Sequence, residues 1–175
     1  MSSKERKMEI VRIDSPTEAK IAWAEAAFKK AKDILLADKA VKRLLEAFKE
    51  ANQATWQKMR ELGIPDICRE CALTEGSCCL KKIDRKFDGV ILLINKLLGV
   101  DLPQKRLYPE GCYFLGPKGC LLWAREIICI NYLCDRILKK IPHEEIVTLQ
   151  QIAGQEMDVI FALQERIKRI LLTHF

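Results

Sequence analysis

The residues of this 175-residue chain with the most specific chemistry are its eight cysteines. They are Cys68, Cys71, Cys78, Cys79, Cys112, Cys120, Cys129 and Cys134. Thiolates are ligands of zinc and of iron–sulfur clusters, and both kinds of site accept an all-cysteine set. No secretory signal precedes them, so we expect a cytoplasmic protein with reduced thiols and favour metal ligation. Four structural disulfides remain a minority alternative.

The spacing of the first four cysteines indicates how they could share a centre. Cys68 and Cys71 have the two-residue separation of a metal knuckle, in which a tight turn aims both sulfurs at one ion. Cys78 and Cys79 are adjacent, and in an extended backbone their side chains point to opposite sides. One of this second pair therefore faces another site or serves in packing.

The last four cysteines are more widely spaced. Cys112 and Cys120 flank the turn sequence 116–119, which predicts a small β-hairpin that brings them together. On one regular helix, Cys129 and Cys134 would lie about 140° apart and would not share a centre easily. If a helix instead begins near Asn131, both cysteines could converge at its positive end.

Several other side chains near the cysteines have two interpretations. The cationic side chains near the cysteines would offset the negative charge of a thiolate-rich site. Each of them taken alone is more typical of a solvated surface residue. They are Arg69, Lys81, Lys82, Lys118 and Arg125. Carboxylates that could replace a thiolate, and are solvated by default, are Glu70, Glu75 and Asp135. Aromatic residues that could cover a cluster or simply pack are Trp23, Trp56, Trp123, Tyr113, Phe114 and Tyr132. The histidines, His143 and His174, are more typical of a helix start and a solvated chain end than of ligands.

The order of these residues resembles the family of zinc- or iron-chelating domains with a CxxCxxxCC signature, which includes the flagellin lysine N-methylases. The resemblance covers about residues 68–134, and its matching positions are the eight cysteines together with Arg125. The chain resembles a divergent member, since six residues rather than three precede Cys78, Glu126 replaces the usual proline, and Ile130 replaces a frequent arginine. The resemblance implies metal or iron–sulfur binding. It does not carry methylase activity with it, so we leave open whether the protein is an enzyme.

The regions on both sides of the cysteines are typical of long amphipathic helices. In segment 15–63, Ser15 is an expected N-cap with Pro16 at the first helical position, Asp38 restarts or kinks the helix, and Gly63 and Pro65 stop it. Its apolar positions are Ile21, Ala24, Phe28, Ala31, Leu35, Val41, Leu44, Leu45, Phe48, Trp56, Met59 and Leu62, whereas Lys20 is placed on another face. The C-terminal helix, in segment 141–175, follows Pro142, and its apolar positions are Ile146, Leu149, Ala153, Met157, Ile160, Leu163, Ile167 and Ile170.

These stripes predict an all-α fold, because long amphipathic helices must bury their apolar faces against one another. A third helix is expected around Asp84–Leu98. We expect one domain, 1–175, in which segments 15–63 and 141–175 embrace a cysteine-rich module, 64–140, with one small β-hairpin. The longest apolar run is too short for a membrane span. The net charge of +6 is modest and makes nucleic acid an unlikely partner, while a protein partner and a homodimer remain open.

Two functional hypotheses follow from the cysteines. The favoured one is a single 4Fe–4S cluster with a redox or protein-modifying role, held by four cysteines. We favour Cys68, Cys71 or Cys79, Cys129 and Cys134 over Cys78, Cys112 and Cys120 as the ligands. The alternative is a zinc-stabilised, non-enzymatic interaction module. The number of centres and the thiols that share each one remain open.

Overall fold

The computed structural model describes residues 9–74 and 82–175. Within these residues the chain forms seven α-helices, one 3₁₀ turn and one two-stranded sheet. The helices are α1 (Thr17–Ala37), α2 (Lys39–Glu61), α3 (Ile64–Thr74), α4 (Gly89–Leu97), α5 (Ile127–Asn131), α6 (Asp135–Lys140) and α7 (His143–His174). The 3₁₀ turn is η1 (Asp84–Lys86), and the strands are β1 (Leu115–Gly116) and β2 (Gly119–Cys120). The predicted all-α fold class is confirmed.

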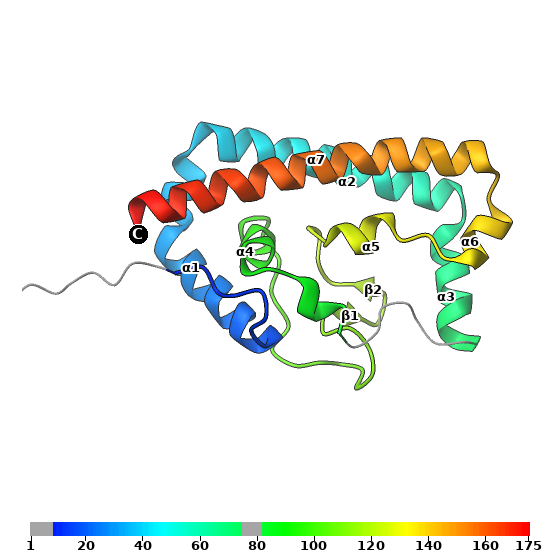
Figure 1. The fold of residues 1–175 in the computed structure, drawn as a ribbon, viewed down its shortest axis with the longest axis horizontal. Coiled ribbons are helices and arrows are strands. Elements are labelled where there is room, and N and C mark those ends of the chain that lie inside the picture. Colours follow the sequence, from blue (N-terminus) through cyan, green and yellow to red (C-terminus); the bar gives the residue numbers. More distant parts are fainter. Residues whose placement is uncertain (1–8, 75–81) are drawn as a thin grey trace, which may run out of the picture.

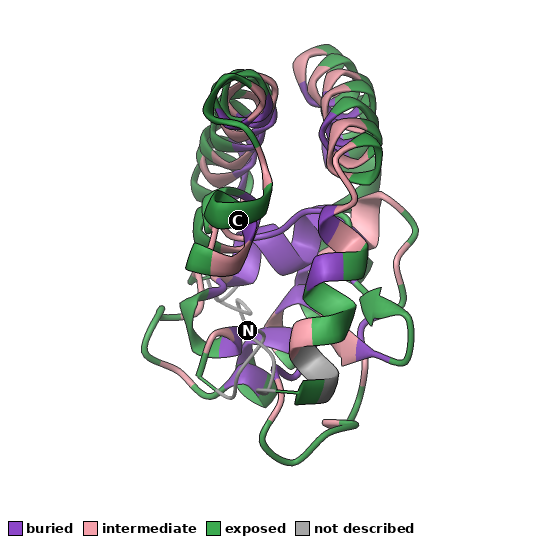
Figure 2. Cartoon of the chain, turned by 90° about the vertical axis from the view of Figure 1, so that its right-hand side faces the viewer, coloured by how far each residue is buried: buried purple, intermediate pink, exposed green. Residues whose placement is uncertain are grey.

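Two long helices form the upper layer of the molecule. α2 and α7 run antiparallel along its whole length, and their contact is the most extensive between any two elements (Figure 1). α1 turns down from the start of α2 and packs against α4, which lies beneath the long pair. The end-on view in Figure 2 shows the two long helices side by side, with the buried residues concentrated on their lower faces and in the layer below. Among the described residues no helix combines the length and apolarity needed to cross a membrane.

The predicted apolar stripes form the core. Every predicted position of α7 is buried except Met157, which is half-buried, and on α1 only Phe28 is half-buried. One expectation for α1 is wrong, because Lys20 is completely buried rather than on a solvated face. Its ammonium group donates to the carbonyl oxygen of Arg85 at 2.8 Å, which replaces part of the hydration lost on burial.

The helix boundaries confirm the predicted role of Asp38. Its carboxylate accepts a hydrogen bond from the backbone N–H of Val41 at 2.9 Å and caps α2. A hydrogen bond from Arg166 on α7, together with that cap, lowers the pKa of Asp38 to about 2. The interaction therefore connects the corner between α1 and α2 with the far end of α7.

The predicted start of α1 is wrong, whereas the predicted stop at Gly63 is confirmed. α1 begins at Thr17 with Pro16 as its N-cap, no side chain caps it, and the hydroxyl of Thr17 donates instead to Asp84 at 2.6 Å. α2 ends at Glu61 as expected, but Pro65 does not prevent a new helix, α3, from following directly. Gly63, in the left-handed region at φ 68°, makes the turn, and Pro65 lies in the first turn of α3, where the missing N–H is tolerated.

The middle of the chain contains the predicted hairpin and a divided third helix. Leu115 pairs with Cys120 and Gly116 with Gly119 in an antiparallel ladder. The helix expected around Asp84–Leu98 is split into η1 and α4, because the side chain of Asp88 caps a new helix by accepting from Ile91 N–H at 2.7 Å.

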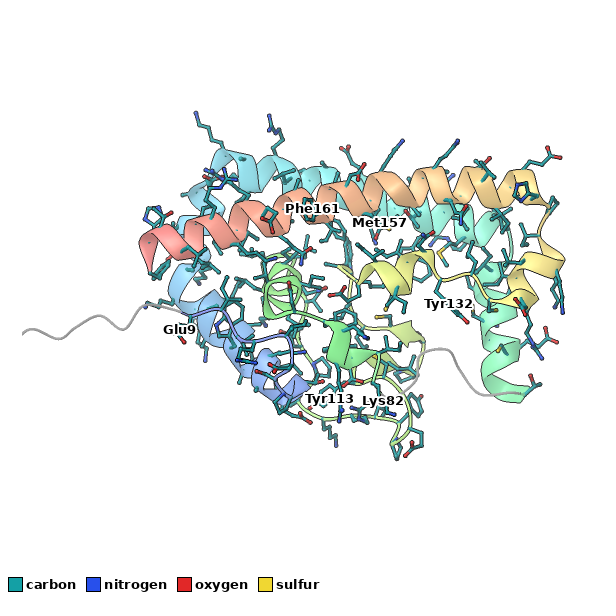
Figure 3. The ribbon with its side chains drawn as sticks, in the orientation of Figure 1. Glu9, Lys82, Tyr113, Tyr132, Met157 and Phe161 are labelled. Atoms are coloured by element: carbon teal, nitrogen blue, oxygen red, sulfur yellow. The ribbon has the colours of Figure 1, made fainter. Side chains whose placement is uncertain are left out.

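We predict that the middle of α7 is a determinant of stability. Leu163 is completely buried, so Leu163→Ala should lower the free energy of unfolding by about 2–5 kcal/mol in urea denaturation. Phe161, labelled in Figure 3, is 63% exposed on the same helix and is the matched control. Phe161→Ala should change stability by less than about 0.5 kcal/mol. Equal losses for the two variants would contradict the assigned face of α7.

Candidate metal-binding site

Six of the eight cysteines lie in the described part of the chain, and Cys78 and Cys79 lie outside it. Cys68 and Cys71 do not sit in a tight turn, as their spacing suggested, but three residues apart on α3. Residues at this separation share one face of a helix, so the two thiols can still act as a pair. Cys68 is exposed and Cys71 is half-buried.

The other four described cysteines lie on separate elements. Cys112 is buried just before β1, and Cys120 is exposed in β2. Cys129 is inside α5, and Cys134 is the N-cap residue of α6. Neither of the two alternatives for this pair is correct: the two cysteines do not lie on one helix, and no helix begins near Asn131, since α5 ends at that residue and the chain is extended at the following tyrosine.

The elements that carry these cysteines gather in one half of the molecule. α3, the hairpin, α5 and α6 all lie beneath the long helix pair, in the half opposite the C-terminus (Figure 1). α3 and α6 are joined by an ion pair between Glu70 and Lys140 at 3.2 Å. Cys134 packs against the small apolar cluster between these helices and the start of α7, whereas Cys112 belongs to the main core and Cys129 packs against it. Considering only the described residues, no three His, Cys, Asp or Glu side chains converge on a position for one metal ion.

A double asparagine clamp fixes the segment that leads into α5. Asn95 of α4 is completely buried and uses its whole amide. Its oxygen accepts from the N–H groups of Trp123 and Ala124 at 2.9 and 3.1 Å, and its nitrogen donates to the carbonyls of Ala124 and Ile91 at 2.9 Å each. Asn52 of α2 donates to the remaining carbonyl, that of Trp123, at 3.4 Å. All four backbone polar groups of these two consecutive residues are therefore bonded to asparagine side chains.

Arg125 follows the clamp and points into the helical layer. It is only 5% exposed, and its guanidinium carbon lies 4.5 Å from the centre of the Trp56 ring, which is a cation–π contact. A solvated surface charge was the simpler expectation for each of the five cations near the cysteines. For Arg125 that expectation is wrong, whereas Arg69, Lys82 and Lys118 are exposed. Lys81 lies outside the described residues.

A second group of charges lies where α1, η1, α4 and α5 meet, and of its members Lys20 and Asp84 are buried while Asp88 and Glu126 are half-buried. Burial lowers the pKa of Lys20, while the carboxylates of Asp84, Asp88 and Glu126 oppose that shift. Burial also raises the pKa of Glu126, and repulsion from Asp88 adds to the effect, so that Glu126 titrates at about 7. Glu126 is the N-cap residue of α5, which places a group that titrates near neutral pH at the start of the helix that carries Cys129.

The aromatic residues divide between core and surface. Phe114 is completely buried, with its ring centre 4.9 Å from that of Phe87, and Tyr113 is also buried. Tyr132 is 58% exposed and Trp123 is 42% exposed, so of the two interpretations given for Trp123, packing in the core is wrong. Figure 3 shows Tyr113 and Tyr132 on different parts of the module.

The sequence analysis missed the polar residues that fasten the module. Asn95, Asn52 and Glu156 are all buried, and each stands at a helical spacing from apolar neighbours. Glu156 lies between the predicted core positions Ala153 and Ile160 on α7. The signal that could have identified these three residues is a single polar residue within an apolar stripe. Such a residue either lies at the exposed edge of the stripe or is hydrogen-bonded inside the core.

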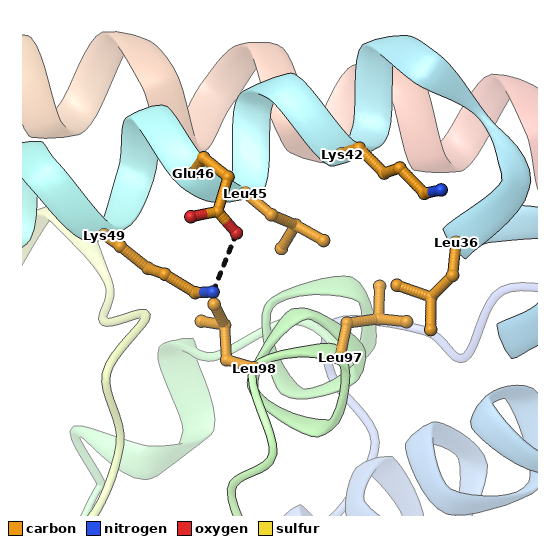
Figure 4. Close-up of a pocket in the computed structure, with 7 residues that line it drawn as sticks. All are labelled: Leu36, Lys42, Leu45, Glu46, Lys49, Leu97 and Leu98. Atoms are coloured by element: carbon orange, nitrogen blue, oxygen red, sulfur yellow. Dashed lines mark hydrogen bonds and ion pairs between the residues drawn. The ribbon is translucent and has the colours of Figure 1, made fainter.

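A shallow groove lies away from these elements. It has a volume of about 320 Å³ and opens between the end of α1, the first half of α2 and the end of α4 (Figure 4). Its floor consists of leucines, namely Leu36, Leu45, Leu97 and Leu98. On its rim Lys49 donates to Glu46 at 2.8 Å, and Lys42 lies further along α2. The residues that line it include no cysteine, so it is separate from the candidate metal site.

No family model matches the chain, and no curated protein or solved structure matches it either.

We predict that the amide of Asn95 is essential for stability. Asn95→Leu keeps a similar volume but leaves the N–H groups of Trp123 and Ala124 and the carbonyl of Ala124 without their partner, at a cost of about 3 kcal/mol or more. Urea denaturation measures the loss, and hydrogen exchange at the two amides locates it. Asn131→Leu alters an exposed asparagine and should cost less than about 1 kcal/mol. Unchanged protection of both amides in Asn95→Leu would contradict the clamp.

We predict that Glu126 makes stability depend on pH near neutrality. Its pKa rises from an ordinary 4.5 to about 7 on folding, so the folded state binds more protons between these values. The free energy of unfolding should therefore decrease as pH rises from about 4.5 to 7, by about 1–2 kcal/mol after allowance for partial solvent exposure. Glu126→Gln should remove this component, and the exposed Glu144→Gln is the control. A wild-type curve parallel to that of Glu126→Gln would refute the prediction.

Proposed function

We propose that the module of residues 64–140 binds a 4Fe–4S cluster through four of its cysteines, and that the protein has a redox or protein-modifying role that depends on this cluster. The observation that carries the proposal is the gathering of α3, the hairpin, α5 and α6, with six cysteines among them, in one half of the molecule. Thiolates on several fixed elements are the donors that an iron–sulfur cluster requires. The resemblance to zinc- or iron-chelating domains supports the same class of ligand.

The favoured ligands are Cys68, Cys71 or Cys79, Cys129 and Cys134. Among the described residues no three possible ligands converge on one position, so binding of the cluster would have to draw the elements that carry these thiols closer together. Cys129 and Cys134 are the favoured described pair, because both are half-buried and follow the clamped segment. Partial burial shields a cluster from solvent while leaving it reachable by a redox partner.

A zinc-stabilised interaction module is the second candidate, and a different observation favours it. Eight large apolar side chains in the described part of the module are exposed, namely Leu107, Tyr108, Leu121, Trp123, Ile127, Ile128, Tyr132 and Leu138. Exposed aromatic and aliphatic residues of this kind are typical of surfaces that bind other proteins. Zinc with four thiolates would serve to fold such a surface and would take no part in a reaction.

The test is the metal content and absorption spectrum of the full chain purified without oxygen. We expect about four irons and four acid-labile sulfides per chain, with broad visible absorption that bleaches on reduction. Each single cysteine-to-serine variant is then analysed in the same way. Four of the eight should lose most of their iron and sulfide, and the other four should keep it.

The control variant is Asn131→Ala, which alters an exposed residue between the two favoured ligands and should retain the wild-type content. One or two zinc ions per chain without sulfide would refute the cluster and support the interaction module. Neither metal, with no thiols that react in the denatured protein, would support disulfides instead.

A further inference from the structure

Two side chains of opposite charge are buried where the segment before α5 meets the long helices, and each contacts α2. Arg125 lies immediately after the asparagine clamp, and Glu156 lies in the middle of α7 with no exposed surface. Removing a guanidinium or a carboxylate from water is costly unless another group compensates its charge and hydrogen bonds. The two residues therefore need partners inside the protein.

Asn52 and Trp56 of α2 bring these charges together. The amide nitrogen of Asn52 donates to Glu156 Oε1 at 2.9 Å and to the carbonyl of Trp123, two residues before Arg125, at 3.4 Å. One turn further along α2, the ring of Trp56 lies 4.5 Å from the guanidinium carbon of Arg125. Positions four residues apart share one face of a helix, so both charged side chains meet the same face of α2.

The polar atoms left over on the two side chains are complementary. Nε and Nη2 of Arg125 are donors and Oε2 of Glu156 is an acceptor, and none of the three has a hydrogen-bond partner among the described residues. The two side chains also form no direct ion pair within 4.0 Å. A water molecule can accept from the guanidinium and donate to the carboxylate at once, and it is the smallest group that satisfies both.

We propose that Arg125 and Glu156 form a buried ion pair bridged by ordered water, and that this pair fastens the cysteine-bearing segment to the α2 and α7 helices. In this role Arg125 is a positioning residue for α5 and for Cys129. The pair joins the segment before α5 to α7, whereas the asparagine clamp joins the same segment to α4 and α2. It requires no metal, so it stands or falls independently of the proposed cluster.

A crystal structure at high resolution tests the bridge directly. We expect a water oxygen within about 3.2 Å of both a guanidinium nitrogen of Arg125 and Oε2 of Glu156. A direct contact between the two side chains would overturn the water bridge. A metal-bound sulfur against the guanidinium would overturn the assignment of Glu156 as its partner.

A double-mutant cycle tests the pairing in solution. Arg125→Met and Glu156→Gln should each raise the equilibrium constant of unfolding about 100-fold, because each leaves one buried group uncompensated. If the residues are paired, the equilibrium constant of unfolding of the double variant should be at least about tenfold smaller than the value obtained by multiplying the two single effects. Independent, multiplicative effects would overturn the pair. If Arg125→Met does not fold, Arg125→Lys replaces it in the cycle, with the same expected sign.

The control cycle uses Glu46→Gln and Lys49→Met, an ion pair of 2.8 Å on the surface of α2. In this control the equilibrium constant of unfolding of the double variant should differ from the product of the single effects by less than about threefold, as expected for a solvated ion pair. The Arg125 cycle is run on both metal-free reduced protein and protein as purified. Coupling in both supports the pair whatever the metal analysis gives, and coupling confined to metal-loaded protein would overturn it.

Discussion

The path of the chain into α5, the helix that carries Cys129, depends on one buried amide, that of Asn95. An amide in an apolar helix is destabilising unless all of its donors and acceptors are satisfied, and Asn95 has four bonds of this kind. Three of them go to the backbone of Trp123 and Ala124, which cannot shift by one residue without leaving the amide unpaired. The amide therefore fixes the register of this segment against α4, and the position of α5 and Cys129 follows from that register.

Apolar burial and polar contacts have different tasks in this fold. The stripes of α1, α2 and α7 supply most of the stabilisation, but apolar contacts tolerate small sliding movements. The buried polar groups between layers are directional: Lys20 bonds to η1, Asp84 accepts from Thr17 and Arg106, and Asn52 bonds to Glu156. Each of these contacts joins elements distant in the sequence. Their directions specify one arrangement of the layers, where the stripes alone would accept several.

The sequence predicts correctly those elements whose formation depends mainly on residues close together in the chain. The periodic stripes, the cap at Asp38 and the turn before Gly119 each act within a few residues, and the structure confirms them. The position of Cys68 and Cys71 was not decidable in the same way, since a two-residue separation suits both a tight turn and a helical turn. The burial of Arg125 and Lys20 depends on distant partners, and no local pattern encodes the presence of Trp56 or of the Arg85 carbonyl.

The module is built from elements too short to be stable by themselves. α5 and α6 have five and six residues, and the two strands have two residues each, whereas isolated helices and hairpins of this size do not persist in water. Their order must come from tertiary contacts, and the clamp acts only at the entry to α5. Beyond it the thiols of Cys129 and Cys134 lie against different apolar clusters. A metal centre that bound thiolates from both would join the parts that the polar contacts leave separate, so in this module ligation and folding would be coupled.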